Sequence, residues 1–124
     1  MPKKKWNKVR RIEHALREAQ QSERGMSPRE ARRILRLARQ GVLSREDASR
    51  IATEVVLLQR QYWQVRAHEV IATARSAAAW DRRTVRILRR FVGRAGIALD
   101  RLGLTLQERQ SVESEPEWSA PPAG

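Results

Sequence analysis

Cysteine is absent from the 124-residue sequence, which excludes disulfide bonds and thiolate metal sites and is typical of a reducing compartment. Long apolar runs are absent as well. None approaches the roughly 20 residues of a membrane-spanning helix, and no signal-peptide segment follows the lysine-rich start. We therefore expect a cytoplasmic protein with no membrane partner.

Residues that carry catalysis or bind cofactors are scarce. The two histidines, His14 and His68, lie far apart, and neither has an acidic or histidine partner at metal-ligand spacing. No glycine-rich phosphate loop is present, because Gly93 and Gly96 are isolated and no Walker lysine follows them. We expect a protein that is not an enzyme and that holds neither a cofactor nor a metal ion.

Positive charge dominates the composition. Lysine and arginine number 26 against 14 acidic residues, a formal net charge of +12. Residues 1–110 hold all 26 basic residues against 11 acids, or +15, and the charges beyond them are Glu113, Glu115 and Glu117. Such a charge repels itself unless a polyanion neutralises it, and nucleic acid is the usual polyanion.

Helix-capping patterns predict an all-α fold, a bundle of four or five helices with one long central helix. A length of 124 residues with 40% apolar residues fits one modest domain with a single core. Gly25 and Gly41 are expected to end the first two helices. N-caps are predicted to open the later helices: Ser27 with Pro28 and Glu30, Ser44 with Asp47, Asp81, and Thr105 with Glu108.

Composition divides the chain into three parts. Residues 1–25 are predicted to form a basic N-terminal helix or arm, and residues 26–110 a helical core and oligomerisation domain. Residues 111–124 are predicted to form an acidic, proline-rich, disordered tail.

The long helix is predicted to start at Arg45 and to reach about Ala74. Because it is apolar over most of its circumference, it is either central in a bundle or buried against copies of itself. We expect a homo-oligomer whose interface uses Ile51, Val55, Leu58, Tyr62 and Val65.

Arginines gather on one face of each of two predicted helices, within arcs of roughly 120° and 140° at about 100° per residue. The first face holds Arg29, Arg32, Arg33, Arg36 and Arg39, and the second holds Arg82, Arg83, Arg86, Arg89, Arg90 and Arg94. Any exposed face must be polar, but ordinary faces mix signs, because like charges one turn apart destabilise a helix by a few tenths of a kcal/mol. We therefore predict that both faces contact the phosphate backbone of DNA.

The four lysines of the chain, Lys3, Lys4, Lys5 and Lys8, lie at its basic start. They form either a phosphate-contacting arm or a solubilising terminus, and we include them among the predicted DNA contacts. No residue pattern indicates readout of base edges, so any site preference is expected to come from DNA shape or from assembly geometry.

Two stretches, "GVLSREDASRIATEVVLLQRQYWQVRAHEVI" and "TVRILRRFVGRAGIALDRLGLTLQERQSV", together resemble one family of phage terminase small subunits. The family has a Gly-[Leu/Val]-Leu-[Ser/Thr]-x-x-Asp entry into a long helix, matched here by Gly41, Val42, Leu43, Ser44 and Asp47. It also has a closing Leu-Gly-Leu-Thr-Pro-x-x-Arg motif, matched by Leu102, Gly103, Leu104, Thr105 and Arg109. Leu106 stands where the family has proline, and the first 30 residues lack the family's proline- and glycine-rich basic lead.

The resemblance implies a non-enzymatic helical protein of a bacteriophage, located in the host cytoplasm and active in viral genome packaging. Such proteins assemble into a ring, bind viral DNA at the packaging start site, and regulate a large ATPase–nuclease subunit. The acidic tail with Trp118 would then contact that large subunit.

Two other functions fit the residues. A helical RNA-binding subunit of a ribonucleoprotein complex would use the same arginine faces. A basic protein–protein adaptor would dock them onto an acidic partner.

Overall fold

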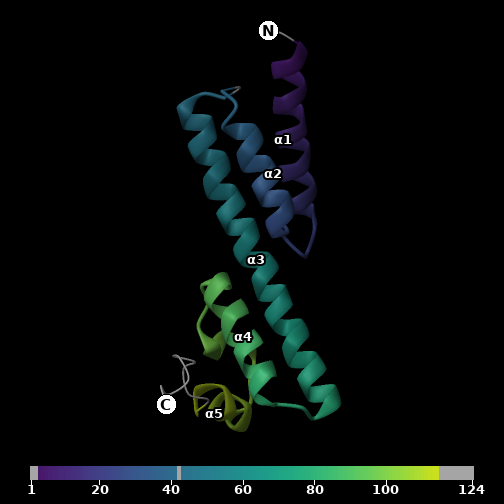
Figure 1. Ribbon diagram of the computed structural model, residues 1–124, viewed down its shortest axis with the longest axis vertical. Coiled ribbons are helices and arrows are strands. Elements are labelled where there is room, and N and C mark those ends of the chain that lie inside the picture. The colour runs from purple at the N-terminus through teal and green to yellow at the C-terminus, as the bar shows by residue number, and fades with distance from the viewer. Residues whose placement is uncertain (1–2, 42, 115–124) are drawn as a thin grey trace, which may run out of the picture. The chain divides into compact units, whose positions relative to one another are not determined.

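The computed structural model describes residues 3–41 and 43–114, and within those ranges the protein is all-α, with no strand (Figure 1). The predicted fold class, an all-α helical bundle, is confirmed. The α-helices are α1 (Lys3–Gln21), α2 (Pro28–Ala38), α3 (Arg45–Ala77), α4 (Arg82–Ala95) and α5 (Leu106–Ser114), and a 3-10 helix, η1 (Leu99–Leu102), precedes α5.

Local hydrogen bonds open the helices where the capping patterns predict. Each predicted N-cap accepts a hydrogen bond from the backbone N–H three residues on: Ser27 from Glu30 (3.3 Å), Ser44 from Asp47 (3.1 Å), Asp81 from Thr84 (2.8 Å) and Thr105 from Glu108 (3.1 Å). At Thr105 the Glu108 carboxylate also accepts the Thr105 N–H at 2.9 Å, which closes a full capping box.

Helix ends depart slightly from the expectation. The first helix ends at Gln21 rather than at Gly25, and α3 continues to Ala77 rather than to about Ala74. Gly96, with a left-handed φ of 66°, caps α4, because a residue without Cβ takes that conformation at little cost.

The chain forms two compact units, Met1–Val65 and Arg66–Gly124, where the composition predicted a single core. Each unit has a core cluster of its own. The first is centred on Ile12, Ile34, Ile51 and Val55, and the second on Ala67, Ile71, Val85 and Leu88. The prediction failed because the 33 residues of α3 give each unit its own stretch of apolar side chains.

The first unit is a three-helix bundle of α1, α2 and the beginning of α3 (Figure 1). The predicted N-terminal arm is largely α1, and its apolar stripe of Ile12, Ala15, Leu16 and Ala19 is buried in this core. From Asn7 onward, therefore, α1 is part of the bundle rather than a separate arm.

The turn between α1 and α2 is held against α3 by hydrogen bonds. The Met26 backbone N–H donates to the Leu58 carbonyl at 3.1 Å, and the side-chain amide Nε2 of Gln59 donates to the Met26 carbonyl at 2.8 Å. Gly25 has φ +69, and a Cβ there would lie 2.3 Å from the Leu58 carbonyl oxygen. Only glycine fits this turn, because both the backbone conformation and the close approach exclude a side chain.

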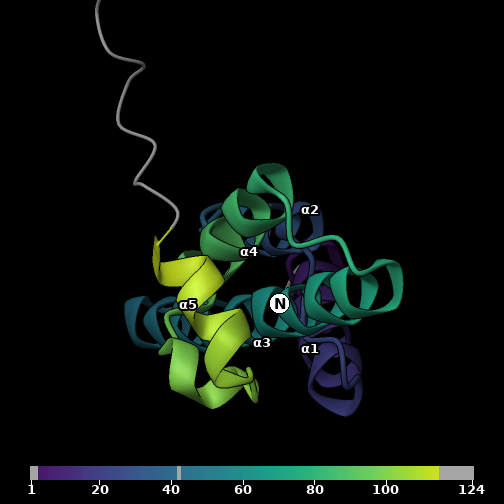
Figure 2. The same cartoon turned by 90° about the horizontal axis from the view of Figure 1, so that it is seen from below.

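The second unit packs α4, η1 and α5 with the latter part of α3 (Figure 2). Arg75 on α3 makes a two-pronged ion pair with Glu108 on α5, at 2.8 and 2.7 Å, and also donates to the Gly103 carbonyl at 3.0 Å. Hydrogen bonds from Arg75, supported by the Thr105 N–H, lower the pKa of Glu108 to about 2.

The predicted disordered tail is wrong over its first four residues. Residues 111–114 are the end of α5, and Val112 is fully buried in the second core. The helix over residues 111–114 was not predicted because Val112 is a single apolar residue among polar neighbours. The rest of the predicted tail, residues 115–124 with Trp118, lies outside the described residues.

Replacing Gly25 with alanine is expected to lower the free energy of unfolding by about 2–4 kcal/mol, because the left-handed backbone and the crowded Cβ both cost energy. The matched control is Gly41→Ala, where φ is +74 and a Cβ would meet nothing within 4 Å. That variant is expected to lose only about 1–2 kcal/mol. Equal losses in urea titrations would contradict the crowding at Gly25.

Replacing Glu108 with glutamine is expected to destabilise the protein at pH 7 by about 1–3 kcal/mol, because the charged partner of Arg75 is lost. The folded-state pKa of Glu108 is depressed from 4.5 to about 2. The stabilisation is therefore complete above about pH 4.5 and disappears as the pH falls towards 2. Urea unfolding at several pH values should show wild type and variant converging there, whereas Glu23→Gln, on an exposed turn, should match wild type throughout.

Candidate nucleic-acid interface

The arginine face of α2 lies on the surface of the first unit. Ala31, Ile34 and Ala38 are buried on the opposite side of the helix. All five predicted contact residues of α2 are exposed: Arg29, Arg32, Arg33, Arg36 and Arg39. The apolar stripe thus fixes the rotation of the helix, and the arginines face solvent as a result.

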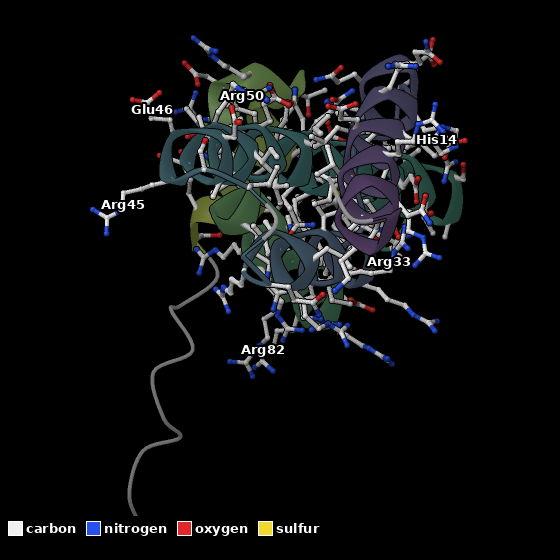
Figure 3. All side chains as sticks on the ribbon, turned by 90° about the horizontal axis from the view of Figure 1, so that it is seen from above. His14, Arg33, Arg45, Glu46, Arg50 and Arg82 are labelled. Atoms are coloured by element: carbon white, nitrogen blue, oxygen red, sulfur yellow. The ribbon has the colours of Figure 1, made fainter. Side chains whose placement is uncertain are left out.

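One of the five arginines is engaged within the helix. Arg33, which is labelled in Figure 3, pairs with Glu30 at 2.7 and 3.2 Å. This pairing raises the pKa of the Arg33 guanidinium. Within the part of the chain that the structure describes, no acidic side chain pairs with the other four, Arg29, Arg32, Arg36 and Arg39. We call these four the α2 arginine face.

The arginine face of α4 belongs to the second unit and is less uniform. Val85, Leu88, Val92 and Ala95 are buried on the other side of this helix. Four of its arginines are exposed, Arg82, Arg83, Arg90 and Arg94, whereas Arg86 and Arg89 are half-buried. At its start the Thr84 N–H, with a smaller contribution from Arg83, lowers the pKa of the capping Asp81.

Arg89 has a partner inside the second unit. Its guanidinium donates to the Glu113 carbonyl at 3.2 Å, in the last turn of α5. A cation there satisfies a carbonyl that the helix leaves without a partner and interacts favourably with the helix dipole. Sequence alone could not separate Arg89 from its neighbours, because the contact joins residues 24 positions apart.

The predicted lysine contacts lie mostly beyond what the structure describes. Lys3, Lys4 and Lys5 begin α1, but their side chains are outside the described residues. Lys8 is described and is half-buried on α1.

Three of the five predicted interface residues lie in the core of the first unit. Ile51, Val55 and Leu58 are at most 7% exposed and belong to the core of the same chain, and Tyr62 and Val65 are half-buried. Burial against α1 and α2 accounts for the first three without a second copy. The exposed large hydrophobic residues of this helix are instead Val56 and Leu57.

Neither a metal-binding cluster nor a membrane-spanning helix occurs within residues 3–41 and 43–114. No group of three or more His, Asp or Glu residues there is arranged to hold a metal ion. None of the helices described is both long enough and apolar enough to cross a membrane.

No protein family, curated protein or solved structure matches this chain.

Arg89 and Arg90 differ in ways that two substitutions can separate. Arg89→Gln is expected to lower the free energy of unfolding by about 1 kcal/mol, because α5 loses a cation at its end. Arg90→Gln removes an exposed charge and is expected to change stability by less than about 0.5 kcal/mol. If α4 contacts DNA, Arg90→Gln should also weaken the salt dependence of binding. The slope of log K against log salt concentration should fall by about 0.9. Identical behaviour of the two variants in unfolding and binding titrations would contradict these assignments.

Proposed function

We propose that this protein is a non-enzymatic DNA-binding protein that contacts the phosphate backbone through the α2 arginine face. The observation that carries the proposal is a set of four exposed arginines on α2 and its C-cap with no acidic partner among the described residues. Their charge is uncompensated within the unit, and a polyanion supplies the compensation.

The spacing of the α2 arginine face suits a duplex. Arg29 and Arg39 are ten residues apart, or about 15 Å along a helix. Double-stranded DNA carries one negative charge per about 1.7 Å of its axis, so a length of about 15 Å holds roughly nine phosphate charges on its two strands, more than enough for the four arginines on the side that they face. Four arginines then bind without needing a particular base, and the binding is strongly salt-dependent.

The exposed arginines of α4 supply a second contact surface in this proposal. Because Arg89 caps α5, we assign the contacts of this helix to Arg82, Arg83, Arg90 and Arg94. The two helices belong to different units, so each can be tested by its own substitutions.

Within this class we propose the role of a phage terminase small subunit, which recognises viral DNA, self-associates, and regulates the large packaging subunit. The support is the ordered pair of motifs that begins at Gly41 and ends at Arg109. Residues 115–124, including Trp118, are the proposed contact with the large subunit.

The double substitution Arg32→Gln/Arg36→Gln tests DNA binding directly. It is expected to weaken binding to a 30-base-pair duplex by roughly tenfold and to reduce the log–log salt slope by about 2, equally for unrelated sequences. Fluorescence anisotropy between 50 and 200 mM salt measures both quantities.

The matched control is Arg50→Gln/Arg109→Gln, which removes the same charge from residues already paired with acids. It should bind nearly as wild type, and an equal loss in both double variants would show charge-driven adhesion without a defined surface. A preference for single-stranded RNA in competition would indicate the ribonucleoprotein function. Absence of nucleic-acid binding near 150 mM salt, together with a co-purifying acidic protein, would indicate an adaptor.

A further inference from the structure

The first unit exposes an apolar ridge on α3. Val56 is 49% exposed and Leu57 is 57% exposed, although both lie in the middle of a core helix. At about 100° per residue, Thr53, Val56, Leu57 and Arg60 share one outward face. All four are exposed, and we call them the α3 ridge.

The same unit also has a groove with an apolar floor. It lies between α1 and the start of α3 and encloses about 490 Å³. Its floor consists of Val9, Ile12, Leu16, Leu43 and Ile51. A hydrogen bond from Gln20 to Glu54, at 3.4 Å, links its two walls. We call this the α1–α3 groove.

Acidic side chains predominate along the walls of the groove. Three acids, Glu13, Asp47 and Glu54, stand against two arginines, Arg17 and Arg50. Arg50 is already paired with Glu54 at 3.3 Å and with Asp47 at 3.8 Å. In a chain of net charge +12, the groove lining therefore carries an excess of one acidic side chain, which favours a basic contact residue there over an acidic one.

We propose that the α3 ridge of one copy of this chain docks into the α1–α3 groove of another. Val56 and Leu57 would cover the apolar floor, and the exposed Arg60 would meet the acidic wall. The apolar part of the ridge would contact the apolar floor of the groove, and the basic residue of the ridge would contact the acidic residues of its wall. Specific protein interfaces combine these two kinds of complementarity.

A single copy cannot satisfy both of its own surfaces. Around α3, Leu57 on the ridge and Glu54 on the groove wall are three positions apart and point roughly 60° apart at about 100° per residue, so the ridge cannot turn into the groove beside it on the same helix. The contact therefore joins two different patches on two copies. It deepens the self-association of the proposed function and rests on it, but it involves neither arginine face.

The test is the light-scattering mass of the full chain after size exclusion, at 0.15 and 0.5 M salt and without nucleic acid. Leu57→Glu is expected to reduce the mass of the assembly to that of a monomer. Leu106→Glu is the matched control, because Leu106 is 75% exposed on α5 in the other unit, and it should keep the wild-type mass.

The groove is tested by two variants, so that misfolding cannot be mistaken for lost contact. Glu13→Arg changes an exposed wall residue, and Val9→Arg places a cation over the floor. Both are expected to lower the mass while helical content and thermal unfolding stay close to wild type.

Mixing a ridge variant with a groove variant tests directly whether the ridge of one copy binds the groove of another. A ridge variant keeps its groove and a groove variant keeps its ridge, so Leu57→Glu mixed with Val9→Arg should yield one-to-one dimers from two monomeric proteins. A monomeric wild type, a wild-type mass for Leu57→Glu, or a mixture that stays monomeric would each overturn the proposal. Because no nucleic acid is present, any of these results leaves the DNA-binding proposal to its own titrations.

Discussion

The close contact between the α1–α2 turn and the middle of α3 determines the arrangement of the first unit. The Met26 N–H reaches the Leu58 carbonyl at 3.1 Å, and Gly25 leaves no room for a Cβ between the turn and the helix. With the turn fixed there, the apolar stripe of α2 packs toward α1 and α3. The arginines of α2 lie on the opposite side of the helix and therefore face solvent, although they repel one another.

Charge is separated by face within this unit as a consequence. Arg29, Arg32, Arg36 and Arg39 occupy the outer side of α2, whereas the acids Glu13, Asp47 and Glu54 line the groove between α1 and α3. Few arginines find partners among these acids, because Glu54 and Asp47 are already engaged with Arg50. One small bundle thus has an exposed arginine face on α2 and, between α1 and α3, a groove with a slight excess of acidic side chains, and the two proposals rest on these two surfaces.

Features that depend on neighbours in sequence were predictable, and features that depend on distant contacts were not. N-caps such as Ser27 and Thr105 bond to residues three positions away, so the pattern itself contains the interaction. The side of α3 that is buried could not be predicted in this way. A helix that is apolar over most of its circumference shows no single buried side in its sequence. Ile51 and Leu58 were therefore assigned to an interface between copies although α1 and α2 bury them within one chain, and the exposure of Leu57 could not be foreseen. The roles of Arg89 and Val112 likewise depend on a contact between α4 and α5 that no local pattern encodes.

Three residues of the closing motif have structural roles in the second unit, which bears on how function is inferred. Leu102 is buried, Gly103 takes a left-handed φ of +67, and Thr105 caps α5. Glu108 closes the capping box and pairs with Arg75, so it stabilises the packing of α5 against α3 in the second unit. When the residues of a motif serve to build the fold, a match to that motif is evidence for a similar architecture rather than for a similar ligand. The proposed DNA contact therefore draws its support from the α2 arginine face, whose residues are not needed for packing and whose charge destabilises the helix that carries it.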